Sequence, residues 1–156
     1  MLKINIITIG KNMPEWINQG FNEYAKRFSS DLQLNLTEIT NIKRFKNSDL
    51  KKIQQEEGQM MLKKINPQDF IIALDEHGIE YSTFELAQQI QHWRENWNNI
   101  CFFIGGPEGL STECLQKANI KFALSRLTFP HPLVRVIVAE QIYRAWTILN
   151  KHPYHR

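Results

Sequence analysis

The sequence predicts an α/β domain with a mainly parallel sheet and helices on both faces, and three observations lead to this prediction. Short strand-like segments alternate with helical patterns along the whole chain. Most of the strand-like segments are continuous apolar runs, which are typical of strands covered on both faces. The 156 residues are 42% hydrophobic and 22% charged, a composition typical of one globular domain. We therefore expect a single domain over residues 1–156.

Five segments have the pattern of strands. Alternating apolar and polar residues predict a strand at 32–39, and compact apolar runs predict the others, at 2–9, 70–74, 100–104 and 120–124. Ligands of parallel sheets bind beyond the carboxyl ends of the strands. The loops after these segments are therefore where we expect a site.

Helical patterns fill the intervals between the strands. Pro14 suits the first turn of a helix, Ser48 is a good N-cap, and Ser82 with Glu85 matches a capping box. Helices are therefore expected at about 14–28, at 48–64, from 82, briefly after 111, and at 133–149.

The charge is small overall but unevenly distributed. The net charge of +3 divides into +3 over residues 1–46, −6 over 47–114 and +6 over 115–156. The segment 41–47 is a basic loop that carries three cations around Phe45. Such asymmetry favours an anionic partner, with nucleic acid first, although a solvated charged face explains it equally well.

Several classes of protein are excluded. No apolar run approaches the ~20 residues of a membrane span, and the N-terminus predicts a strand rather than a signal peptide, so we expect a cytoplasmic protein. Cys101 and Cys114 are expected to be reduced core thiols. His152 and His155 lack the further ligands of a metal site, and no metal is expected.

The run from 102 to 111 is the most informative stretch for function. An apolar strand ends there in Gly105, Gly106 and Gly109, which either form a tight turn or let a ligand lie against the main chain. The run matches neither common nucleotide-binding glycine motif. Comparable loops follow the strands at Leu74 and Leu124, so three loops at one sheet edge predict a pocket.

The last predicted helix and the tail carry further candidates. The helix is apolar nearly all round, which predicts that one face meets a second subunit. Glu140 and Arg144 have the spacing of a local ion pair, while Arg135 points either into the pocket or into solvent. The tail beyond Pro153 is either frayed or free to stack on and contact RNA.

Together, several motifs resemble the ribosomal RNA large subunit methyltransferase H family over nearly the whole chain. They are ITIGK at 7–11, EG at 57–58, LD at 74–75, IGGPEGL at 104–110, LTFPHPLVR at 127–135, EQIYRA at 140–145 and YHR at 154–156. The resemblance implies a SPOUT methyltransferase with a C-terminal trefoil knot that works as a homodimer. The implied reaction moves the methyl group of S-adenosylmethionine to N3 of a pseudouridine in large-subunit (23S) rRNA of the assembled ribosome.

The resemblance also implies roles for residues. The implied cofactor-binding positions are Leu74, Gly105, Leu124, Ser125, Arg126, Leu127, Thr128 and Phe129. The implied catalytic positions near the substrate are His131, Arg135, Glu140, Arg144, Tyr154, His155 and Arg156.

The chemistry needs a donor methyl aligned with N3 and a group that accepts or stabilises the N3 charge when its proton leaves. His155 or Glu140 is the expected base, and Arg135, Arg144 or Tyr154 the expected oxyanion partner. The sequence does not choose between them. The competing hypotheses are a non-catalytic RNA-binding α/β module and, third, an enzyme acting on a small phosphorylated ligand.

Overall fold

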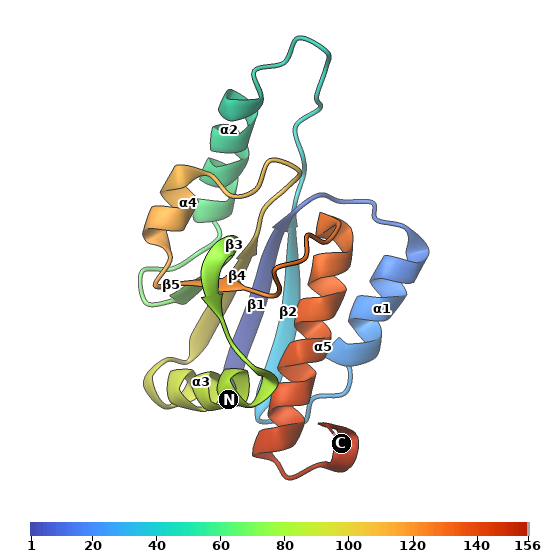
Figure 1. Cartoon of the computed structure of the whole chain (residues 1–156), viewed down its shortest axis with the longest axis vertical. Coiled ribbons are helices and arrows are strands. Elements are labelled where there is room, and N and C mark those ends of the chain that lie inside the picture. The colour runs from blue at the N-terminus through green and yellow to red at the C-terminus, as the bar shows by residue number, and fades with distance from the viewer. Residues whose placement is uncertain (156) are drawn as a thin grey trace.

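Five parallel strands form the central sheet in the order β2-β1-β4-β3-β5 (Figure 1). The computed structural model describes residues 1–155. The strands are β1 (Leu2–Ile9), β2 (Leu32–Ile39), β3 (Phe70–Glu80), β4 (Asn99–Ile104) and β5 (Ile120–Ala123). The predicted parallel α/β architecture is confirmed.

Strand β3 is longer than the apolar run at 70–74 predicts. Its register with β5 shifts between Leu74 and Ile79, and pairing then resumes with Phe122 and Ala123. The sequence hides this extension because the polar residues of the bulge interrupt the apolar pattern.

Five α-helices and a short 3-10 turn complete the chain. Ser82 forms the predicted capping box with Glu85, whereas Asp49, rather than Ser48, caps the second helix by accepting a hydrogen bond from the Lys52 amide. The elements are α1 (Glu15–Ala25), α2 (Leu50–Leu62), α3 (Thr83–Asn96), α4 (Thr112–Lys117), α5 (His131–Leu149) and η1 (Pro153–His155).

The helices cover the sheet in two layers. Buried residues of α1, α3 and α5 share one core cluster with the strands, and those of α2 and α4 share a second cluster on the other face. The strands supply both clusters because successive side chains point to opposite faces: Ile6 belongs to the first and Ile7 to the second. Cys101 and Cys114 are buried free thiols of the second cluster, as predicted.

Helix α5 lies beside α1 and α3 on the same face of the sheet (Figure 1). Its apolar residues are therefore largely covered within the chain: Ile142 is buried against the sheet, and Tyr143 packs against Tyr24 of α1. Packing of α5 against the sheet, α1 and α3 therefore explains why the helix is apolar nearly all round. The pattern does not by itself require a second subunit. Ile137 is a half-buried apolar residue of α5 outside both core clusters. Within residues 1–155, no helix is long and apolar enough to span a membrane.

Candidate functional site at the carboxyl edge of the sheet

Two adjoining pockets lie where β4 and β5 end, beside the bulge of β3. The larger, of about 490 Å³, is lined by residues 74–76, 106–110 and 128–131 together with Leu115. The smaller, of about 170 Å³, is lined by 74–76, 122–129 and Val134. The three predicted segments therefore converge at one pocket region, although residues 74–76 lie in the bulge of β3 and not in a loop after it.

The implied cofactor positions lie almost entirely in these pockets. Leu74, Thr128 and Phe129 line both of them. The other residues of this group line the smaller pocket: Leu124, Ser125, Arg126 and Leu127.

Gly105 differs from the other positions because it does not line either pocket. A Cβ atom at Gly105 would lie 2.5 Å from the Gly109 carbonyl carbon and 2.7 Å from the Leu110 nitrogen. Gly109 has φ +80°, and its amide donates to the Gly106 carbonyl oxygen at 2.9 Å. Gly105 and Gly109 therefore form a tight turn, and that turn presents the residues between them to the larger pocket.

The pocket walls combine apolar surface with negative charge. Leu74, Leu110 and Phe129 supply apolar wall, and the acidic residues on the lining are Asp75, Glu76 and Glu108. Such a lining suits a ligand with a flat apolar part and a positive centre. Among residues 1–155, no Lys or Arg lines the larger pocket.

His131, the first residue of α5, lines the larger pocket. Burial lowers the pKa of its imidazole, and the positive charges of Arg135 and Arg44 lower it further. Its side chain is therefore neutral at neutral pH, and a neutral imidazole can accept a proton or a hydrogen bond.

Arg135 points neither into the pocket nor into solvent. Its side chain is fully buried, and Nη1 donates to Glu38 Oε2 at 2.7 Å. Nη2 donates to the Gly10 carbonyl oxygen at 3.4 Å. Arg135 thus joins the start of α5 to the ends of β1 and β2, immediately behind His131.

Three of the other implied catalytic residues form a separate group, the distal cluster of Glu140, Arg144 and Tyr154. Glu140 Oε1 accepts hydrogen bonds from Arg144 Nε at 2.9 Å and from the Tyr154 hydroxyl at 3.1 Å. The ion pair predicted from the spacing is confirmed. Burial first, with nearby Tyr24 and the Glu140 charge, raises the pKa of Tyr154 to about 12, so its hydroxyl remains a donor.

The tail is ordered rather than free. Residues 153–155 form η1, and the Tyr154 ring packs edge-on against Tyr143 with centroids 4.7 Å apart. His155 lies against Phe84 of α3, with ring centroids 6.4 Å apart. Helix α5 ends at Leu149, before Pro153 as predicted, but residues 150–155 are neither frayed nor free within one chain. Arg156 lies outside the described residues.

The six predicted catalytic residues that the structure describes thus do not form one site within a single chain. The helical rise of about 1.5 Å per residue places Glu140 about 13 Å and Arg144 about 20 Å beyond His131 along α5. Figure 1 shows the C-terminal turn at the opposite end of α5 from the pocket loops.

A further cluster at the pocket was not predicted. The Arg44 cluster joins Arg44 of the basic loop to Glu57 of α2 and Glu108 of the pocket lining, with Nη2 2.7 Å from each carboxylate. The signal that could have revealed it is a carboxylate on an apolar helix face, because Glu57 lies between buried Ile53 and Met61 at four-residue spacing.

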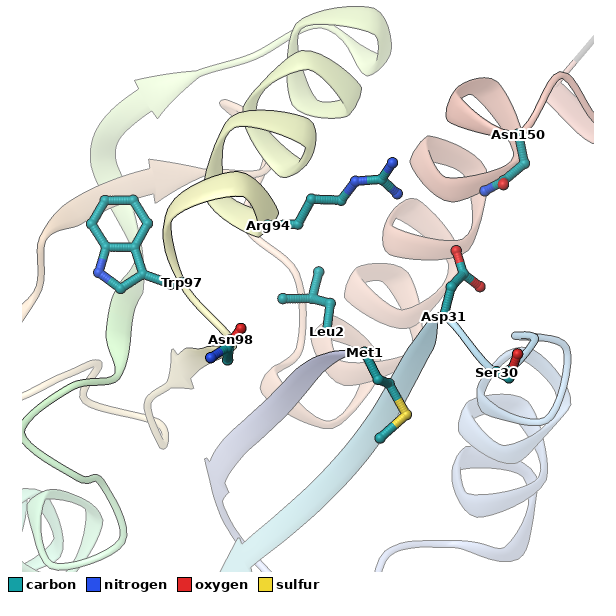
Figure 2. Close-up of a pocket in the computed structure, with 8 residues that line it drawn as sticks. All are labelled: Met1, Leu2, Ser30, Asp31, Arg94, Trp97, Asn98 and Asn150. Atoms are coloured by element: carbon teal, nitrogen blue, oxygen red, sulfur yellow. The ribbon is translucent and has the colours of Figure 1, made fainter.

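Another pocket lies at the opposite edge of the sheet. Figure 2 shows its lining, with Met1, Asp31 and Arg94 around a volume of about 340 Å³. Burial raises the pKa of Asp31, but hydrogen bonds from Ser29 and Trp146 bring it below its ordinary value. Of the implied site residues within 1–155, none lines this pocket, so we place the functional site at the carboxyl edge.

Comparison with known proteins connects this geometry to a family. The model of a family described as predicted SPOUT methyltransferase matches residues 2–155. Proteins named ribosomal RNA large subunit methyltransferase H are similar over the whole chain. That of Coxiella burnetii is 50% identical over 155 residues, covering 99% of this chain and 100% of the relative. That of Methylococcus capsulatus is 48% identical with the same coverage.

The fold is also similar to a solved structure. A probable methylase family protein from Haemophilus influenzae Rd KW20 aligns with a TM-score of 0.56 at 13% identity, covering 98% of this chain and 70% of that one. At this identity the likeness shows the fold alone. The full-length match to the family model and to its relatives shows that the chain belongs to the ribosomal RNA large subunit methyltransferase H family of SPOUT methyltransferases.

Proposed function

We propose that this chain transfers the methyl group of S-adenosylmethionine to N3 of a pseudouridine in large-subunit ribosomal RNA of the assembled ribosome. The observation that carries the proposal is the full-length match to methyltransferases named for that rRNA. The alternative of a non-catalytic RNA-binding module does not account for a pocket at the sheet edge whose lining includes seven of the eight implied cofactor positions.

The pocket residues fit S-adenosylmethionine. Leu74, Leu127 and Phe129 offer apolar surface to an adenine, and the lining carboxylates Asp75 and Glu76 suit ribose hydroxyls or a positive sulfonium. The cofactor supplies an electrophilic methyl group. The turn at 105–109 holds the main chain where it can hydrogen-bond such a ligand.

His131 and the distal cluster are proposed to act on the RNA base. His131 is neutral and lines the larger pocket, which suits accepting or orienting the N3 proton. Glu140 Oε1 already accepts hydrogen bonds from Arg144 and Tyr154, so within one chain this oxygen is engaged by its own neighbours. Tyr154 and Arg144 keep donor character and suit a developing oxyanion.

A homodimer is part of the proposal because one chain separates its candidate groups. The distal cluster lies at the far end of α5 from its own pocket, and the half-buried Ile137 leaves part of that helix available for contact. A twofold arrangement brings the distal end of one copy towards the pocket of the other if the α5 helices pack antiparallel. The trefoil knot and the cytoplasmic location implied by the family belong to the same proposal.

Two assays test the function. Purified protein is incubated with tritiated S-adenosylmethionine and ribosomes from cells that lack the modification, and the labelled nucleotide is mapped. Label at N3 of one pseudouridine is the expected result. Calorimetry with S-adenosylmethionine runs in parallel, because an RNA-binding module would bind ribosomes without binding the cofactor.

A further inference from the structure

The basic loop at 41–47, which connects β2 to α2, has no role in the function described so far. It projects beyond the carboxyl edge of the sheet at the top of Figure 1, the end at which the pocket loops lie. Residues 43–52 contain five basic residues against one acidic residue, a net charge of +4. The most exposed apolar side chain of this loop is Phe45, at 65%.

Arg44 anchors the loop to the pocket. Its guanidinium makes five hydrogen bonds: one to the Ile42 carbonyl oxygen and two each to the carboxylates of Glu57 and Glu108. These use the full donor capacity of the group, so Arg44 has no donor left for phosphate. Because Glu108 lines the larger pocket, the anchor fixes the loop at the rim of that pocket.

Both ends of this anchor are well defined. Glu57 is buried and also accepts a hydrogen bond from the Ile42 amide at 2.9 Å. The hydrogen bonds from Arg44 lower the pKa of Glu108, so its carboxylate stays charged at neutral pH. The three charges of the Arg44 cluster sum to −1, and its members are mutually satisfied.

The neighbours of Arg44 point outward. Lys43 and Lys46 are exposed, and neither takes part in an ion pair within residues 1–155. The Lys43 ammonium lies over the Phe45 ring, 5.2 Å from its centroid. A turn fixes the backbone here, since the Phe45 amide donates to Ser48 Oγ at 2.7 Å. An exposed aromatic ring between two unpaired cations, held on a fixed backbone, is what single-stranded RNA recognition uses.

We propose that the loop at 41–47 is an RNA-contacting arm, in which Phe45 stacks on an unpaired base and Lys43 and Lys46 contact phosphates, while Arg44 holds the arm at the pocket rim. The proposal rests on the proposed function for its substrate. It adds a substrate contact outside every position that the family resemblance implies.

The test compares two matched pairs of lysines in the full-length protein. K43A/K46A removes the arm's cations, and K63A/K64A removes the same charge at the other end of α2. We expect K43A/K46A to raise the KM for ribosomes at least tenfold. The slope of the logarithm of the binding constant against the logarithm of the salt concentration should become shallower by about 2, because two phosphate contacts are lost. The affinity for S-adenosylmethionine stays at the wild-type value. Equal behaviour of the two variants would overturn the proposal.

Phe45→Ala tests stacking separately. We expect a roughly tenfold weaker binding to ribosomes and to protein-free large-subunit rRNA, with an unchanged melting temperature. If Phe45→Ala weakens binding to ribosomes but not to protein-free rRNA, the arm contacts a ribosomal protein, and the proposed RNA contact is overturned. If the wild-type protein transfers no methyl group, the proposed function fails, and these binding measurements still decide the role of the arm.

Discussion

The two ends of helix α5 carry similar residues but have different surroundings. At the first end, Arg135 is buried and joined to Glu38, and His131 faces a pocket. At the other end, Arg144 and Glu140 are partly exposed, and Glu140 Oε1 accepts hydrogen bonds from both Arg144 and the Tyr154 hydroxyl. The first end therefore faces an open pocket, whereas the polar groups of the second are paired with one another. Within one chain, the implied catalytic residues at the two ends of α5 therefore lie apart.

The largest expected effect concerns the distal end. Deleting residues 154–156 should abolish methyl transfer to ribosomes while leaving the affinity for S-adenosylmethionine within about threefold of wild type, because the tail lies far from its own pocket. Filter-bound tritium and calorimetry measure the two quantities. Full activity of the truncated protein would remove the tail from the active site.

The tail also packs against its own chain, so a gentler variant is needed. Tyr154→Phe keeps the ring against Tyr143 and removes the hydroxyl that donates to Glu140. If the hydroxyl acts on the substrate, activity should fall on the order of a hundredfold, and the melting temperature should change little. A hundredfold loss with unchanged melting separates chemistry from packing.

The next effect tests the turn at the pocket end. Gly105→Ala places a Cβ 2.5 Å from backbone, whereas Gly106→Ala places one at an ordinary 3.4 Å from Ile9. Overpacking of this kind costs about 1–3 kcal/mol. We expect Gly105→Ala to lose at least tenfold in cofactor affinity and several degrees of melting temperature, and Gly106→Ala, which has room for its Cβ, to keep the melting temperature of wild type. Calorimetry and thermal unfolding check both variants, and equal behaviour would contradict the turn's role.

The oligomeric state decides whether the two ends act together. Ile137→Glu places a charge on a half-buried apolar position of α5 outside the core clusters, and should convert particles of twice 18.4 kDa into monomers without loss of helix content. Leu50→Glu, on the opposite face of the sheet, controls for added charge. Light scattering makes the measurement, and a wild-type monomer at micromolar concentration would contradict the homodimer.

Much of the fold follows from local patterns, because apolar runs and caps depend on nearby residues. The strands and the Ser82 cap are of this kind. The pocket loops were also predictable, since the carboxyl ends of parallel strands share an edge. The buried position of Arg135 could not be predicted in this way, because its partner Glu38 is 97 positions away in the sequence. The Arg44 cluster was missed for the same reason: Glu108 is 64 positions from Arg44.

A smaller effect is expected on stability, where the ion pairs of Arg135 and Arg144 in α5 should differ. Arg135→Met leaves the partly exposed Glu38 without its buried partner, and we expect a loss of about 2–3 kcal/mol in the free energy of unfolding. Arg144→Met breaks an i,i+4 pair that is partly exposed, and such pairs contribute about 0.3–0.5 kcal/mol. Urea unfolding of both variants gives the difference. Equal losses would mean that Arg135 is not the structural link described here.

The smallest effect is a pH dependence at the pocket end. The pKa of His131 is lowered in the folded chain, chiefly by burial and then by Arg135. At pH values between this lowered pKa and the ordinary pKa of 6.5, His131 is protonated in the unfolded chain and neutral in the folded chain. The free energy of unfolding therefore falls as the pH falls through this range. Above pH 6.5 the contribution of His131 to the free energy of unfolding does not change with pH.

His131→Gln should therefore lose less stability than wild type between pH 7.5 and 5, measured by urea unfolding at each pH. His77→Gln, at an exposed position, controls for the loss of an imidazole. A steeper loss in His131→Gln would mean that the folded state favours the protonated ring, and His131 would then be unsuited to accept the N3 proton.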